Sequence, residues 1–93
     1  MMYEIRFTAK MRRDAKRMAK RGKDMSKLTA CLALLASGAK LPDTYKDHPL
    51  SGSYSGNREC HLEPDWLLVY RIHEEKLILV ATETGSHADL FGL

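Results

Sequence analysis

The histidines of this sequence are the residues whose types and positions could support acid–base chemistry. All four lie after residue 47. His48 stands in a long irregular segment, His61 alternates with apolar residues in RECHLE, and His87 stands in the C-terminal stretch TGSHADLFG. Glu59 shares the face of His61, and Asp65 follows in a Pro-Asp turn signal. If the C-terminal stretch folds back over an open sheet face, the three histidines converge with these carboxylates.

Three interpretations of this set are open from the residues alone. The first is an ordinary polar surface. The second is a metal site, but successive spacings of 13 and 26 residues match no zinc signature, so we expect no metal and no cofactor. The third is metal-free cleavage of RNA, for which histidine is suited because it titrates near neutral pH. One group would take the ribose 2′-hydroxyl proton, another would protonate the leaving 5′-oxygen, and cations would stabilise the phosphorane.

The charge of the chain is uneven. Residues 1–27 hold ten Lys or Arg and three Asp or Glu, a net charge of +7, whereas residues 28–93 hold five and nine, a net charge of −4. This asymmetry predicts a polyanion or an acidic protein as partner, or else a solvated basic helix face. No apolar run is long enough to cross a membrane, and the N-terminus lacks the apolar stretch of a signal peptide. We therefore expect a cytoplasmic protein with no membrane partner.

The N-terminal part of the chain is predicted to form one strand and two helices. Residues 3–7 alternate as a strand does. One helical pattern covers residues 9–21 behind the N-cap Thr8, and a second covers residues 25–37 behind the N-cap Asp24. The second helix is apolar nearly all round, so it must be buried on more than one side. The first has a narrow apolar stripe that consists of Met11, Ala15 and Met18.

Three strand patterns make up most of the remaining chain, after a long irregular segment at residues 39–56. They are separated by Pro64-Asp65, which suits a tight turn, and by the weaker turn signal Glu74-Glu75. The order β-α-α-β-β-β predicts one α+β domain over residues 1–93, with two helices packed on a small, mainly antiparallel sheet. The three patterns cover residues 57–63, 66–73 and 76–83.

The turn at Pro64-Asp65 also predicts which side chains face the helices. A two-residue turn places Glu59 opposite Tyr70 and His61 opposite Leu68. Two cysteines in apolar patterns, at positions 31 and 60, are expected to be buried free thiols. The predicted core face consists of Cys60, Leu62, Leu67, Val69, Ile78 and Val80. The predicted open face consists of Glu59, His61, Glu63, Trp66 and Tyr70.

Four separated motifs resemble the YafQ-type branch of the RelE/ParE toxin superfamily. YKDHPLSGSYSGNRECHLEPDWLLVYRI and the later TGSHADLFG are similar to that branch, and KRGKDMSKL resembles the link between its two helices. The resemblance covers nearly the whole chain, and the motifs stand in the right order. It implies a RelE-like fold and a bacterial type II toxin that enters the ribosomal A site and cuts mRNA there. A cognate antitoxin would neutralise it, and the pair would bind operator DNA, which is therefore an indirect partner.

The resemblance also implies roles for individual residues. The histidine of KDHPL is His48, the histidine of the strand is His61, the aspartate of EPDW is Asp65, and the histidine of the tail is His87. These four are the expected catalytic residues. We expect His87 to be the general acid, His48 or Asp65 to be the base, and His61 to position the phosphate or share a proton.

Other residues are expected to support catalysis or to bind RNA. Glu59 occupies an acidic position where the branch usually has aspartate, and Phe91 is the aromatic residue of LFG, which would stack a base or pack the tail. The main alternative is a ParE-like toxin that binds and poisons DNA gyrase without catalysis, and a further one is a degenerate toxin that only binds DNA with its partner. The cations expected to contact RNA or the ribosome are Arg13, Lys16, Arg17, Lys20, Lys46 and Arg58.

Overall fold

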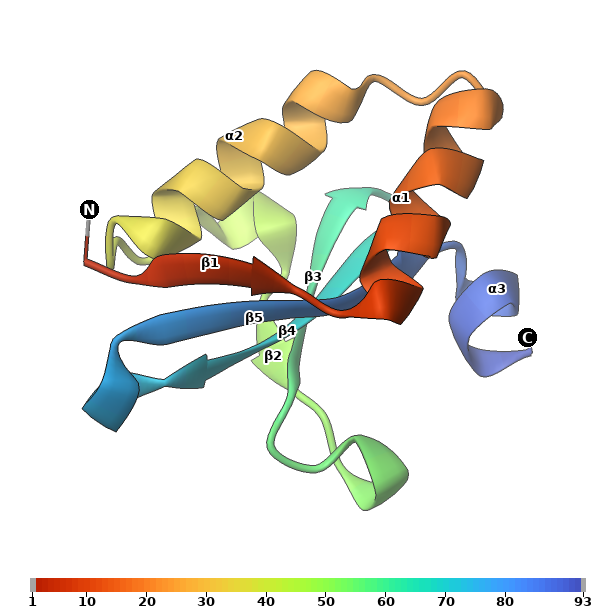
Figure 1. The fold of residues 1–93 in the computed structure, drawn as a ribbon. Helices are drawn as coiled ribbons and strands as arrows, with labels where there is room; N and C mark the ends of the chain where they lie inside the picture. Colours follow the sequence, from red (N-terminus) through yellow and green to blue (C-terminus); the bar gives the residue numbers. More distant parts are fainter. Residues whose placement is uncertain (1, 93) are drawn as a thin grey trace.

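Five strands form one sheet, and two helices cover one of its faces (Figure 1). The computed structural model describes residues 2–92. The strands are β1 (Glu4–Phe7), β2 (His48–Pro49), β3 (Arg58–Glu63), β4 (Trp66–His73) and β5 (Ile78–Gly85). The helices are α1 (Ala9–Lys20), α2 (Met25–Ala36) and α3 (His87–Phe91), and short 3-10 turns are η1 (Asp43–Tyr45), η2 (Gly52–Tyr54) and η3 (Glu74–Lys76).

The strands follow the order β1-β5-β4-β3-β2, in which β1 runs parallel to β5 and every other pair is antiparallel. The predicted α+β class and the order β-α-α-β-β-β are confirmed. Two elements are added to the prediction. Strand β2 lies inside the segment expected to be irregular, and helix α3 forms in the C-terminal stretch. Both additions carry a histidine, so both bear on the site described below.

The predicted helix caps explain where α1 and α2 begin. The Thr8 side chain accepts a hydrogen bond from the Met11 N–H, and the Asp24 side chain accepts one from the Ser26 N–H. Each helix ends one residue earlier than the pattern predicted, and Gly22 follows the end of α1 with a φ of 84°, a conformation that glycine adopts without strain. The apolar stripe of α1 packs on the sheet, with Met18 fully buried. Removing such a side chain typically costs about 2–5 kcal/mol, so this stripe fixes which face of α1 points outward.

The pairing of β3 with β4 differs from the prediction by one residue. Glu59 pairs with Val69, not Tyr70, and His61 pairs with Leu67, not Leu68, because the register shifts at a β-bulge between His61 and Glu63. A one-residue shift moves every side chain of the neighbouring strand to the opposite face. The core therefore holds Trp66, Leu68, Tyr70, Leu79 and Ala81, and the predictions of Leu67, Val69, Ile78 and Val80 for the core face are wrong, as are those of Trp66 and Tyr70 for the open face.

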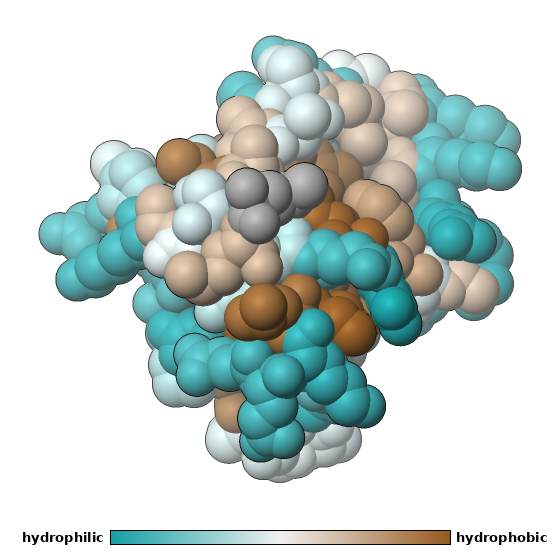
Figure 2. Space-filling view, turned by 60° about the vertical axis from the view of Figure 1, so that its left-hand side comes forward, coloured by the Kyte–Doolittle hydropathy of each residue, from teal (hydrophilic) through white to brown (hydrophobic). Residues whose placement is uncertain are grey.

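The interior also holds the two cysteines. Cys31 of α2 and Cys60 of β3 are both fully buried free thiols, as predicted, with their Sγ atoms 3.6 Å apart. Hydrophilic residues border the apolar ones on the face turned forward in Figure 2, where the brown residues form a limited central area. Within residues 2–92, no helix has the length and apolar character needed to cross a membrane.

Candidate active site

On strands β2 and β3, two histidines, His48 and His61, lie close to the buried carboxylate of Glu59. His48 and Glu59 are direct cross-strand partners, and the His48 Nε2 lies 3.2 Å from Glu59 Oε1. The Nε2 of His61, two residues further along β3, lies 3.4 Å from the same oxygen. The side chain of Glu59 is only 7% exposed, whereas that of His48 is 50% exposed. Glu59 is thus hydrogen-bonded to His48 and lies within ion-pair distance of His61, and His48 is the group of this cluster most accessible to a ligand.

The burial of Glu59 has a simple physical basis. A buried carboxylate is tolerated when hydrogen-bond donors or charges compensate its lost hydration, and the two imidazoles supply these. Val69, its cross-strand partner on β4, and Leu67, the partner of His61, are both fully buried on the same face. The register shift therefore places Val69 and Leu67 of β4 beside the polar cluster, where the prediction had Tyr70 and Leu68.

A second pair lies where the β3–β4 turn meets α3. The backbone N–H of His87 donates to Asp65 Oδ1 at 2.9 Å, and its ring Nδ1 lies 2.6 Å from the same oxygen. These bonds, the backbone one first, hold the pKa of Asp65 below its usual value, so the carboxylate is ionised at neutral pH. Because an ionised carboxylate only accepts, Nδ1 donates to Asp65, and Nε2 is the ring nitrogen of His87 that is left for a ligand.

The two groups meet at His61. Its ring centroid lies 5.7 Å from that of His87, with the rings inclined at 60°. The three histidines expected to converge therefore do so, together with Glu59 and Asp65. Read in space, the order is His48, Glu59, His61, His87 and Asp65. In such an arrangement one imidazole, His48, can accept a proton, and another, His87, can donate one. An anion can be held between them.

Helix α3 is fixed by three sets of contacts. Ser86 and Asp89 form a capping box, in which the Ser86 hydroxyl accepts from the Asp89 N–H and the Asp89 carboxylate accepts from the Ser86 N–H. Arg21, the C-cap residue that follows α1, donates two hydrogen bonds to Asp89 at 2.5 and 2.9 Å. This guanidinium is the main cause that holds the pKa of Asp89 far below its usual value. Phe91, expected to stack or to pack, lies edge-on to Tyr54 with centroids 5.3 Å apart.

The expected cations fall into two groups. Arg58 is paired with Asp47 at 3.1 Å, and Asp47 also accepts a hydrogen bond from the buried Tyr70 hydroxyl at 2.6 Å. Arg17 is likewise paired, with Asp14 at 2.9 Å. The others are exposed, and none of them forms an ion pair with the part of the chain that the structure describes: these are Arg13, Lys16, Lys20 and Lys46.

Three aspartates that pair with basic residues were not among the residues predicted from the sequence: Asp14, Asp47 and Asp89. Asp14 is buried and accepts from Lys10, Arg17 and the Thr84 backbone N–H. It stands three residues after Met11 and four before Met18, so it lies within the apolar stripe of the helix. This position could have predicted from the sequence that the Asp14 carboxylate is buried. Asp47 has no comparable signal, because its partners are remote in sequence, whereas Asp89 stands three residues after Ser86, the spacing of a capping box.

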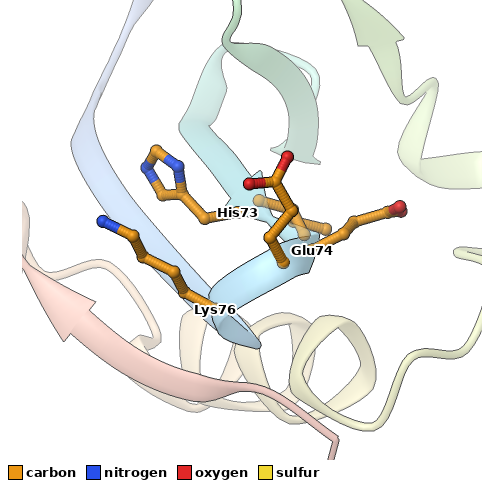
Figure 3. Close-up of a pocket in the computed structure, with 5 residues that line it drawn as sticks. His73, Glu74 and Lys76 are labelled. Carbon is orange, nitrogen blue, oxygen red and sulfur yellow. The ribbon is translucent and has the colours of Figure 1, made fainter.

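The first cluster also has the composition of a metal site. One ligand atom from each of His48, Glu59 and His61 lies within 4.8 Å of the other two. Two imidazole nitrogens and one carboxylate oxygen suit zinc or copper. The sequence spacing did not indicate this convergence, since the β2–β3 pairing creates it. The fourth histidine lies elsewhere: His73 is exposed and lines a pocket of about 380 Å³ at η3, which none of the expected catalytic residues lines (Figure 3).

Comparison with known proteins gives consistent matches over nearly the whole chain. The model of the family described as "Bacterial toxin of type II toxin-antitoxin system, YafQ" matches residues 3–92. The mRNA interferase toxin YafQ of Escherichia coli K12 is 43% identical over 90 residues, which cover 96% of each chain.

Two solved structures share the fold. The toxin chain in the crystal structure of the E. coli DinJ–YafQ complex has a TM-score of 0.89 and 42% identity, and the match covers 97% of this chain and 99% of that one. A toxin from Helicobacter pylori, solved in a metal-bound form, has a TM-score of 0.90 and 41% identity over 98% and 100% of the two chains. The similarity extends to the whole described sheet and its three helices.

Proposed function

Because this chain belongs to the YafQ family of bacterial type II toxins, we propose that it cuts mRNA by metal-independent acid–base catalysis at the histidine cluster. It is an mRNA interferase, that is, an endoribonuclease that acts as the toxin of a toxin–antitoxin pair. The observation that carries the proposed chemistry is the continuous series from His48 through Glu59 and His61 to His87. It offers one accessible imidazole at one end and a second imidazole, oriented by Asp65, at the other.

The reaction begins at the half-exposed end of this series. His48 takes the proton of the ribose 2′-hydroxyl, and the oxygen attacks the adjacent phosphorus. Glu59 is too buried to reach a ribose, so its role is to orient His48 and to stabilise the imidazolium that forms. Asp65, the other expected base, already binds His87 through two hydrogen bonds and is therefore assigned to orientation.

The reaction ends at the other imidazole. His87 gives its Nε2 proton to the 5′-oxygen as the P–O bond breaks, which leaves a 2′,3′-cyclic phosphate on one product and a 5′-hydroxyl on the other. His61, between the two, is placed to hold a phosphate oxygen. Lys46 is an exposed cation on the segment before His48 and is the expected source of further positive charge.

The proposed partners follow from the family and from the charge distribution. The E. coli YafQ has been solved in complex with DinJ, and we extend to this chain a cognate antitoxin, with operator DNA bound only through that complex. The ribosome is the proposed site of action, and the exposed residues Arg13, Lys16 and Lys20 of α1 would contact its RNA. Phosphate contacts of this kind are independent of sequence and weaken with salt.

The alternative of a ParE-like gyrase poison is not favoured. The E. coli relative is an mRNA interferase, and a protein that acts by binding alone has no use for three imidazoles and two carboxylates in one series. The two functions are separated by adding the purified chain to ribosomes programmed with a defined mRNA and, in parallel, to a gyrase supercoiling reaction. We expect mRNA cleavage and unchanged supercoiling. Inhibited gyrase with intact mRNA would contradict the proposal, and His73→Gln, a histidine outside the series, is the matched control that should cut normally.

A further inference from the structure

Two adjoining hollows lie beside His61 on the outer edge of β3. One, of about 400 Å³, lies between α2, η1 and β3, and the other, of about 270 Å³, continues along η1 to the β3–β4 turn. Both are lined by Thr44, His61 and Leu62. Because they share these three residues, they form one groove, which we call the β3-edge groove. It opens directly from the histidine series.

The groove exists because β2 is short. Strand β2 pairs only with Arg58 and Glu59, so the edge of β3 from His61 onward has no neighbouring strand. An open strand edge next to reacting groups is a place where a substrate can extend past the bond that is cut. Any RNA whose phosphate lies between His61 and His87 must continue on both sides of that phosphate, and the β3-edge groove is the hollow that borders His61.

The lining of the groove combines apolar, aromatic and charged residues, and it includes Tyr45, Lys27 and Lys46. Leu62 and Ala30 supply apolar surface, and the Thr44 side chain is exposed. Glu63 lines the far end, where its carboxylate is paired with Lys27. Because this pair leaves Lys46 as the lysine of the groove that could meet a phosphate, we weigh the base more heavily: a flat base gains from apolar contact and from polar groups at its edge.

Glu63 is fixed and ionised. Its two oxygens accept hydrogen bonds from Lys23 at 2.8 Å and from Lys27 at 2.9 Å. These two ammonium groups lower the pKa of the carboxyl below its usual value. A carboxylate oxygen has two acceptor positions, so each oxygen retains one for a ligand. The group therefore presents acceptors and no donor to the groove.

We propose that the β3-edge groove holds a base adjacent to the scissile phosphate, and that Glu63 selects adenine or cytosine over uracil. The adenine N6 and cytosine N4 amino groups can donate to a carboxylate, whereas uracil has the carbonyl oxygen O4 at the corresponding position. This inference rests on the proposed function, since it assumes that RNA is cut at the histidine series.

The test uses ribosomes programmed with mRNAs that differ by one base on either side of the cut. At one of these two positions we expect the wild-type chain to cut adenosine- or cytidine-containing mRNA about tenfold or more faster than the uridine counterpart, as for one good base contact. In Glu63→Gln, whose amide both accepts and donates, the ratio should fall below about threefold, since uracil gains a donor. Equal cutting of all bases by the wild type, or an unchanged ratio in Glu63→Gln, would overturn the inference.

The double variant Lys23→Gln/Lys27→Gln is the matched control. It removes the same two ion pairs, together with the Lys27 ammonium group of the groove lining, but keeps the carboxylate, so the base preference should persist even if the melting temperature falls as in Glu63→Gln. Loss of the preference in this variant would mean that fold, and not the carboxylate, determines it. A failure of the proposed function is distinguishable, because then no mRNA would be cut whatever its sequence.

A second variant tests the groove without touching Glu63. Ala30 is exposed on α2 and lines the groove, so Ala30→Trp should fill it with little effect on folding. We expect slower cutting of the preferred mRNA and a base ratio near one. If Ala30→Trp weakened antitoxin binding and left the base ratio unchanged, the groove would serve the antitoxin and the inference would be wrong.

Discussion

The two carboxylate–histidine groups of the site are built in opposite ways. Glu59 is 7% exposed and lies in the middle of a sheet strand, with His48 and His61 on one of its oxygens. Asp65 is 67% exposed, stands in a turn, and binds a histidine on a five-residue helix. Backbone pairing of β2, β3 and β4 fixes the first group. Side-chain contacts fix the second: the capping box and the ion pair between Arg21 and Asp89.

Because of this difference, substitutions in the two groups should affect the stability of the fold and the cleavage rate differently. A change in the buried group must alter both, because it leaves polar atoms of the sheet without partners. A change at the exposed group should alter the reaction and leave the fold intact, since exposed substitutions usually change stability by less than about 0.5 kcal/mol. Substitutions in the two groups should therefore have different effects, which are given below from the largest to the smallest.

The largest effect is expected at His87. His87→Gln keeps the size and polarity of the side chain but cannot deliver a proton at neutral pH, so the cleavage rate should fall by roughly 10²–10⁴-fold, the usual contribution of a general acid. The melting temperature and antitoxin binding should be unchanged. A paired thermal melt and ribosome-dependent cleavage assay measure both. A variant that cut within about threefold of wild type would remove His87 from the acid role and leave tail packing as its function.

A smaller but double effect is expected at Glu59. Glu59→Gln retains one acceptor but loses the charge, so the rate should fall by about 10–100-fold, as is common for residues that act through another group. Because the carboxylate is buried, we also expect the free energy of unfolding to fall by about 1–3 kcal/mol. Denaturant unfolding and cleavage kinetics test this together. An unchanged stability with a large loss of rate would show that the two groups do not differ as described.

The basic helix should affect binding alone. Arg13→Glu/Lys16→Glu reverses two exposed charges on the face opposite the apolar stripe, and ribosome binding should weaken by about tenfold or more with a shallower salt dependence. The rate at saturating ribosome concentration should stay the same. Arg17→Gln is the informative comparison, because Arg17 already pairs with Asp14 and its loss should weaken binding less. Normal binding of the double variant at physiological salt would identify this surface as merely solvated.

The smallest effect concerns pH and Asp89. Its pKa in the folded state is lowered, chiefly by Arg21, so the ionised carboxylate stabilises the fold at every pH above its unfolded value of about 4. This contribution declines as the pH falls below about 4, where the unfolded chain takes up a proton that the folded chain does not, and it is lost only as the pH falls through the much lower folded pKa. The difference in melting temperature between wild type and Asp89→Asn should thus be constant from pH 7 to about pH 5 and begin to narrow below about pH 4. A gap that stayed constant down to about pH 3 would exclude this ion pair as its cause.

The sequence predicted the elements well because local signals define them. Thr8 and Asp24 are caps, and the apolar stripe of α1 contains Met11 and Met18, so the helices follow from short stretches of chain. The face of β4 could not be predicted, because a bulge near His61 depends on pairing between strands and not on the turn residues alone. A single shifted residue was enough to bury Tyr70 where an exposed side chain was expected.

For the candidate site too, the sequence indicated some features and not others. Motifs identified His48, His61, Asp65 and His87, but their mutual distances depend on β2 and α3, which are too short to produce a periodic pattern. The ion pairs of Arg58 and Arg21 join residues 11 and 68 positions apart. No local signal predicts such pairs, and the pair with Asp47 engages Arg58, one of the cations expected to contact RNA.

The central claim is that the ribose 2′-hydroxyl is the nucleophile and that histidines, without a metal, move the protons. The most direct test is to cut ribosome-bound mRNA in the presence of EDTA, at a free Mg²⁺ level that keeps the ribosome assembled, and to identify the ends of the products. Added zinc, which His48, Glu59 and His61 could bind, should not be needed. We predict a 2′,3′-cyclic phosphate or 3′-phosphate on the upstream fragment and a 5′-hydroxyl on the downstream fragment. Fragments with a 5′-phosphate, or cleavage restored only by zinc, would contradict the account.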